Sequence, residues 1–148
     1  SIDSMGNMFA RHEGCEPDLH PVMTGSHLDT QPTGGRYDGV LGVLAGLEVV
    51  RTIRDMGIRT RRPIIVVNWT NEEGTRFAPA MLASGVFAGV HRQDWAYARE
   101  DAQGHPHGQI TFKQSHLETP KLCGVQLRAM SSSAGSVRWM RPRASAKA

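Results

Sequence analysis

One histidine and four carboxylates have the types and the spacing that could bind divalent metal ions and use them in hydrolysis. A borderline cation such as zinc binds imidazole nitrogen and carboxylate oxygen, and a pair of such ions needs a carboxylate that can bridge them. The candidates are the triplet His27-Leu28-Asp29, then Asp38 eleven residues after the histidine, and the adjacent pair Glu72 and Glu73. This pattern predicts half of a two-metal hydrolytic site.

The chemistry of His27, Asp29 and Asp38 indicates a different role for each side chain. His27 is predicted to bind metal through one ring nitrogen, while the nearby Asp29 carboxylate fixes the tautomer of the ring. Asp29 is therefore counted among the catalytic residues as a support for the ligand. Asp38 is the candidate bridge between two ions.

Asp38 and the acidic pair each have a structural alternative. Asp38 directly precedes an apolar, glycine-containing segment, so its carboxylate could instead cap the amino terminus of a helix. Glu72 and Glu73 could be solvated loop charges, but they follow the apolar run of residues 64–69, which is typical of a buried parallel strand. Acids at the carboxyl end of a strand lie where α/β sheets place their chemistry. Both interpretations of Asp38 stay open at this point.

Apolar spacing and glycine or proline breaks predict the elements that position these residues. Strands are expected over residues 4–10, 22–26 and 64–69, and helices over 39–56 and about 79–86. A strand, a helix and a strand of these lengths predict a crossover that joins two parallel strands.

The helix over residues 39–56 is predicted to have one buried and one solvated face. Gly42 and Gly46 would allow it to pack closely on a sheet. The periodic positions on which this prediction depends are Leu41, Leu44, Ala45, Leu47, Glu48 and Ile53.

Two long segments carry a resemblance to a known family. They are GSHLDTQPTGGRYDGVLGVLAGLEVVR and NWTNEEGTRFAPAMLASGVFAG. Through them, the stretch from about residue 4 to residue 104 resembles the M20-type metallohydrolases, in the branch of N-carbamoyl-L-amino-acid hydrolases, β-ureidopropionases and allantoate amidohydrolases. The resemblance implies an α/β fold, namely part of a zinc-peptidase-like catalytic domain with a parallel or mixed sheet flanked by helices.

The resemblance also implies a cofactor and a role for each residue. The family uses two divalent metal ions, zinc or else manganese, cobalt or nickel. On this likeness His27 binds one ion, Asp38 bridges both and Glu73 binds the second. Glu72 is the general base that takes a proton from the attacking water.

The implied reaction is hydrolysis of the carbamoyl C–N bond of a small-molecule substrate. Substrates would be N-carbamoyl amino acids such as N-carbamoyl-β-alanine or N-carbamoyl-L-amino acids. Residues 30–35 look more like the carbamoyl-amino-acid side of the branch than like the alternative, the allantoate amidohydrolases. The family forms homodimers through a lid domain that is not recognisable in this chain.

Further ligands of the family are also not recognisable. The family site is completed by a histidine in an HIEQGP-like segment and by another far downstream. The segment His116-Leu117-Glu118 is similar to the first half of the HIEQGP-like segment. The residues after Glu118 differ from it, so we expect His116 to be a surface histidine. We expect a chain truncated at both ends, with a frameshift after Met130 as one explanation of its Ser-, Ala- and Arg-rich end. The metal site would then be incomplete and the chain inactive alone; the alternative is a catalytically inactive remnant with residual metal binding.

Composition and charge predict one incomplete domain and a tail. Residues 1–118 are interpreted as the partial catalytic domain and residues 119–148 as an aberrant or disordered basic tail. The net charge is +3, but six basic side chains and no acidic ones follow Glu118, so the first 118 residues carry three more acidic than basic side chains. The basicity belongs to the tail, and nucleic acid is not an expected partner.

The cysteines and the two neighbouring histidines carry no clear motif. Cys15 and Cys123 are predicted to be free thiols, and no apolar run is long enough to cross a bilayer, so a cytoplasmic location with no membrane partner is expected. His105 and His107 are expected to face solvent, because the proline and glycines around them give no rigid frame for a ligand.

Overall fold

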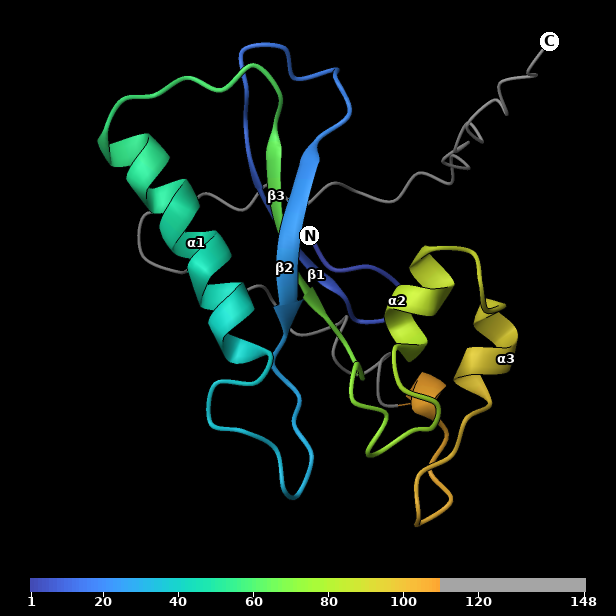
Figure 1. Ribbon diagram of the computed structural model, residues 1–148. Helices are drawn as coiled ribbons and strands as arrows, with labels where there is room; N and C mark the ends of the chain where they lie inside the picture. Colours follow the sequence, from blue (N-terminus) through green and yellow to red (C-terminus); the bar gives the residue numbers. More distant parts are fainter. Residues whose placement is uncertain (110–148) are drawn as a thin grey trace, which may run out of the picture.

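The computed structural model describes residues 1–109, which contain three strands and three helices (Figure 1). The predicted tail, His116 and Cys123 lie outside the described residues. The elements are β1 (Met8–His12), β2 (Val22–His27), α1 (Val40–Asp55), β3 (Ile64–Trp69), α2 (Leu82–Phe87) and α3 (Gln93–Tyr97).

The three strands form one mixed sheet in the order β1-β3-β2. β2 and β3 are parallel, as the crossover predicted, and β1 is antiparallel to β3. β3 is the central strand and is covered on both faces, by α1 at Val66 and by Phe87 at Trp69, which explains why its sequence is almost continuously apolar. The α/β fold class and the strand over residues 64–69 are therefore confirmed. β1 starts later than predicted, because Gly6 with a φ of 83° lies in a turn ahead of it.

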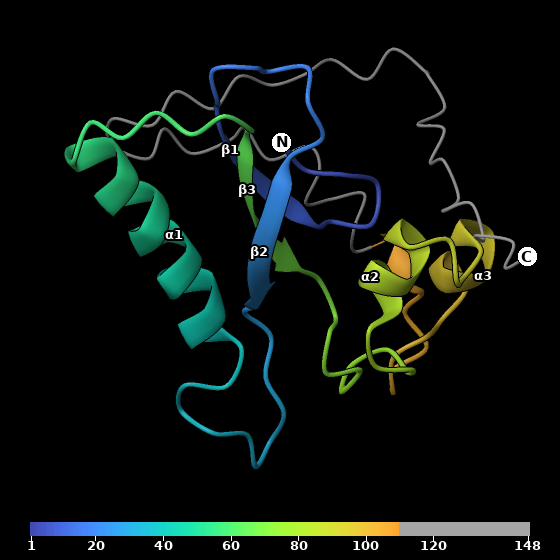
Figure 2. The same ribbon diagram turned by 45° about the horizontal axis from the view of Figure 1, so that its top comes forward.

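α1 packs on one face of the sheet, while α2 and α3 lie to its other side (Figures 1 and 2). The close approach of α1 depends on its glycines: a Cβ on Gly42 would lie 2.6 Å from the Cβ of Ser26, and one on Gly46 would lie 3.0 Å from Val66. Val43 and Gly46 are the buried residues of the helix.

The predicted close packing through Gly42 and Gly46 is confirmed, but the large apolar residues of the predicted pattern do not form the buried face. Leu41, Leu44 and Leu47 are 62%, 56% and 44% exposed, because the glycine-bearing side, which allows the backbones to approach, is the side that faces the sheet. The period of the pattern was correct, but the heavier side chains point away from the described sheet.

The opposite face of β3 carries aromatic side chains. Trp69 contacts Phe9 and Phe87, with ring centroids 6.0 Å and 5.1 Å away. Next to them, α2 and α3 close a small core that consists of Met5, Phe77, Leu82, Ala83 and Ala96. No helix within residues 1–109 is long and apolar enough to cross a membrane.

His107 does not face solvent as predicted. Its ring packs edge-on against Phe77 with centroids 4.9 Å apart, and the residue is only 2% exposed. His105 has a mostly exposed side chain, as expected, and Cys15 is an exposed free thiol. Burial, and secondarily the positive charge of Arg76, lower the pKa of His107.

This burial predicts a loss of stability in mild acid. The folded chain binds a proton on His107 less readily than the unfolded chain, whose histidine titrates near an ordinary pKa of about 6.5, so stability falls as the pH drops below that value. Lowering the pH from about 7.5 to about 5.5 should therefore reduce the melting temperature more in the wild type than in His107→Gln, as measured by thermal unfolding. Equal losses in the two proteins would show that His107 does not contribute.

Candidate metal centre

The predicted ligands meet at one edge of the sheet. His27 is the last residue of β2, and its backbone is in register with Trp69, the last residue of β3. Glu72 and Glu73 follow β3 in a short loop, and Asp38 lies just before α1. Since carboxyl ends of parallel strands lie at the same edge, residues far apart in sequence converge here.

The ring of His27 is buried, with a defined hydrogen-bonding pattern. Its Nδ1 lies 2.9 Å from the carbonyl oxygen of Asp29. A carbonyl oxygen only accepts, so Nδ1 carries the proton and, in the neutral ring, Nε2 presents a lone pair. That lone pair faces Glu72 Oε2 at 3.3 Å and Asp38 Oδ1 at 3.9 Å. A proton or a metal cation between these atoms would satisfy all three groups.

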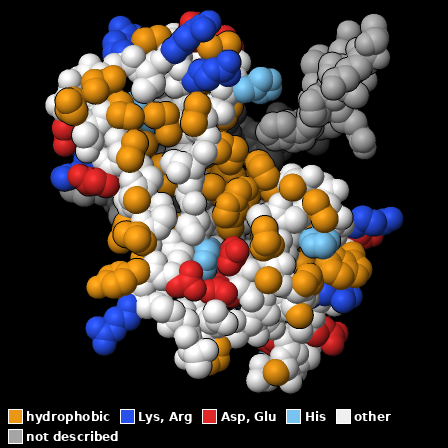
Figure 3. Space-filling view, viewed as in Figure 1, with side chains coloured by type: hydrophobic (Ala, Val, Ile, Leu, Met, Phe, Trp, Pro, Cys, Tyr) orange, Lys and Arg blue, Asp and Glu red, His pale blue; other side chains and the backbone are white. Residues whose placement is uncertain are grey.

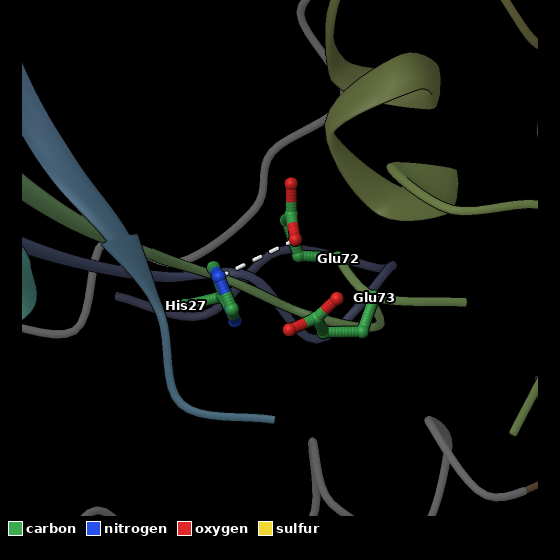
Figure 4. A group of neighbouring side chains, drawn as sticks. All are labelled: His27, Glu72 and Glu73. Carbon is green, nitrogen blue, oxygen red and sulfur yellow. Dashed lines mark ion pairs between the residues drawn. The ribbon is translucent and has the colours of Figure 1, made fainter. Parts of the chain in front are cut away.

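The two glutamates and Asp38 crowd negative charge beside this ring. Ligand atoms of His27, Glu72 and Glu73 all lie within 4.8 Å of one another, and Figure 4 shows the three side chains converging. Acidic side chains also gather next to a histidine on the surface seen in Figure 3. Burial, and then the charge and the hydrogen bond of Asp38, raise the pKa of Glu73.

These residues fit a divalent cation. Oε1 of Glu73 is buried and has no hydrogen-bond partner, so one carboxylate oxygen is left for a ligand that is not a protein group. Imidazole nitrogen with carboxylate oxygens is the donor set of zinc and of other borderline divalent ions. Among the described residues, His27, Glu72 and Glu73 are the group whose ligand atoms lie close enough together to hold one ion.

Asp29 links the histidine to the acidic loop. Its two carboxylate oxygens accept hydrogen bonds from the backbone N–H groups of Glu72 and Glu73, at 3.1 Å and 3.0 Å. Its Oδ1 lies 3.6 Å from Nδ1 of His27, farther than its own carbonyl oxygen. Asp29 thus contacts the ring mainly through its backbone and the glutamate loop through its side chain.

The start of α1 resolves the alternative interpretation of Asp38. Gly39, not Asp38, is the N-cap residue, and α1 has no side-chain cap hydrogen bond. Gly39 itself was missed by the sequence analysis. Its φ is 72°, and a Cβ there would lie 2.5 Å from Nδ1 and Cε1 of His27. The Asp-Gly pair ahead of an apolar helix was the only available signal.

A buried asparagine was also missed. Asn7 is fully buried, and its Oδ1 accepts a hydrogen bond of 2.9 Å from the backbone N–H of Thr70, at the start of the glutamate loop. Its Nδ2 donates to Asp3 at 2.9 Å. A single asparagine near the start of a chain gives no sequence signal of this role.

A mixed α/β sheet that carries a histidine and several carboxylates at its carboxyl edge is typical of metal-dependent hydrolases. Residues 23–131 match the sequence profile of Peptidase family M20/M25/M40. This match covers more than half of the chain, and the chain belongs to that family.

Individual relatives agree with this family. The chain is 66% identical over 107 residues to an N-carbamoyl-L-amino-acid amidohydrolase of Rhizobium meliloti, a match that covers 72% of this chain and 26% of the relative. It is 43% identical over 120 residues to an N-carbamoyl-L-amino acid amidohydrolase of Geobacillus stearothermophilus, covering 81% of this chain and 29% of the relative. The chain thus spans between a quarter and a third of the length of these relatives.

A solved structure gives the same result for the fold. The crystal structure of a hydantoinase/carbamoylase family amidase from Burkholderia ambifaria superposes with a TM-score of 0.75 at 57% sequence identity. The superposition covers 78% of this chain and 28% of that chain.

Proposed function

We propose that this chain carries the metal-binding part of an amidohydrolase that cleaves the carbamoyl C–N bond of N-carbamoyl amino acids. The observation that carries the proposal is the lone pair of His27 Nε2, which faces the carboxylates of Glu72 and Asp38 at 3.3 Å and 3.9 Å. The names of the relatives in R. meliloti and G. stearothermophilus support the substrate class.

In this proposal His27, Asp38 and Glu73 would hold two divalent ions, with Asp38 contributing to both. When bound, such ions supply Lewis-acid polarisation of a carbonyl oxygen and make water more acidic. Glu73 suits a ligand because its Oε1 is buried and unpartnered. Burial and the nearby carboxylates raise the pKa of Glu73, because they disfavour its negative charge. A bound cation would offset this effect by stabilising the charged carboxylate.

Glu72 suits the general base for a different reason. Its side chain is 29% exposed, so it can reach an attacking water and return the proton to the leaving amine. Its backbone N–H is fixed by Asp29 at 3.1 Å, which limits how far the carboxylate can move. Asp29 therefore orients both the ligand His27 and the base.

A chimera tests the proposal. The 107 aligned residues of the R. meliloti relative are replaced by those of this chain, and ammonia release from N-carbamoyl-L-amino acids is measured with added zinc, manganese or cobalt. We expect turnover that is lost on chelation and lost in the same chimera with His27→Ala. A folded chimera without metal-dependent turnover would contradict the proposal.

The 148-residue chain alone is the second arm of this assay. We propose that it turns over slowly or not at all, because the described part of the chain offers three ligand residues for two ions, and catalytic zinc usually keeps three protein ligands for each ion. Binding of one weakly held ion by the chain alone, with an inactive chimera, would favour the alternative of an inactive remnant with residual metal binding.

A further inference from the structure

The loop that carries the two glutamates begins at a residue in an unusual conformation. Asn71 has a φ of 53°, in the left-handed region that asparagine tolerates better than most residues do. It is also buried, with 8% of its surface exposed. A buried polar side chain in this conformation needs partners, and it has them.

The side-chain amide of Asn71 pairs with both backbone groups of one residue. Its Nδ2 donates to the carbonyl oxygen of Phe77 at 2.6 Å, and its Oδ1 accepts from the N–H of Phe77 at 3.2 Å. Phe77 belongs to the small core and is 4% exposed. These two bonds close the loop from Asn71 to Phe77 and attach it to the core.

The glutamates are thus held from two sides. Asn71 fixes the ends of the loop to the core, and Asp29 accepts the backbone N–H groups of Glu72 and Glu73 on the side of His27. The carbonyl oxygen of Glu72 also accepts a bond of 2.6 Å from Met81. Because these hydrogen bonds fix the peptide groups on either side of Glu72, the direction of each carboxylate depends mainly on the side-chain torsions of Glu72 and Glu73.

We propose that Asn71 is a positioning residue, which aims Glu72 and Glu73 at the metal centre by clamping their loop to Phe77. This inference rests on the proposed function for the identity of the centre. The position requires a residue that tolerates a positive φ and pairs with both backbone groups of Phe77, and asparagine meets both requirements. Aspartate lacks the donor for the Phe77 carbonyl, leucine leaves two buried backbone groups unpaired, and glutamine is one methylene longer.

The first test needs no metal. Amide hydrogen exchange is measured by NMR on the full 148-residue chain, in the wild type, in Asn71→Gly, which keeps the positive φ, and in Asn71→Asp, which keeps the shape. The control is Val86→Ala, since Val86 packs on the same core without bonding to the loop. Relative to the core amide of Val67, we expect exchange at Glu72 and Glu73 to rise about tenfold or more in both Asn71 variants, and not in the control.

The second test measures zinc affinity by calorimetry on the same proteins. We expect the Asn71 variants to bind zinc about tenfold or more weakly, and Val86→Ala to stay near the wild type at a similar loss of melting temperature. Exchange at Glu72 and Glu73 that changes only in step with Val67, or that is already unprotected in the wild type, would overturn the inference. A wild type that binds no zinc would instead contradict the proposed function, while the exchange result still decides the clamp.

Discussion

Glutamine at position 72 is expected to leave the metal bound and to lower turnover at least about a hundredfold, the usual contribution of a general base. The amide is nearly isosteric but cannot accept a proton, while the bond from the backbone N–H of residue 72 to Asp29 is unchanged. The measurement is ammonia release by the chimera with Glu72→Gln, together with its metal content.

Glu73→Gln in the same chimera is the matched comparison. Its carboxylate has a buried, unpartnered oxygen, so we expect loss of bound metal as well as loss of turnover. Retained metal in Glu73→Gln and lost metal in Glu72→Gln would show that the two roles are reversed.

Gly39→Ala is expected to weaken metal binding at least about tenfold without contacting the metal itself, as changes around a ligand often do. The new Cβ would lie 2.5 Å from Nδ1 of His27, so the ring must move or turn. Such a shift also disturbs the hydrogen bond from Nδ1 to the Asp29 carbonyl oxygen, which sets the tautomer. Zinc calorimetry on the full chain measures the effect.

Gly57 provides the control for backbone strain. Its φ is 65°, close to the 72° of Gly39, but a Cβ there would meet nothing within 4 Å. Gly57→Ala should lose about 1–2 kcal/mol of stability from its positive φ alone. Gly39→Ala should lose more, because its ψ is −57° and its Cβ also meets the ring and the backbone oxygen of His27, so a loss of zinc affinity only in Gly39→Ala reports the contact with His27. Equal zinc affinity in the two variants would mean that Gly39 serves only the backbone.

The sequence predicted those parts of the fold that depend on strong local patterns. The run of residues 64–69 is apolar because both faces of the central strand are covered, by α1 and by Phe87, and the strand and its parallel pairing with β2 were predictable from this run and the helix before it. The face of α1 was not predictable in the same way. Large side chains usually mark the buried face, but here the backbones of α1 and β2 approach through Gly42, so the leucines point outward.

In the candidate site, too, the residues were predictable from the sequence but the contacts that position them were not. The residue types and spacing indicated His27, Asp38 and Glu73, whose roles as ligands stay predictions, and the structure brings them together. The contacts that hold them were not readable, because the bonds of Asn71 to Phe77 and of Asp29 to the glutamate loop join a side chain to backbone groups that only the folded chain brings together. His107 was also misjudged, since its ring fills a space beside Phe77 that only the folded chain creates.

The position of β2 has a consequence for how the site assembles. Within the described sheet, β2 lies at an edge and is held by β3 on one side only, yet it ends in His27. A metal centre held by His27, Asp38 and Glu73 would therefore cross-link the edge strand to the segment that follows the central strand. Such a link closes a long loop of the chain, so part of its binding free energy becomes folding free energy. Protein without the ion would then fray first at the strand that carries its only histidine ligand among the described residues.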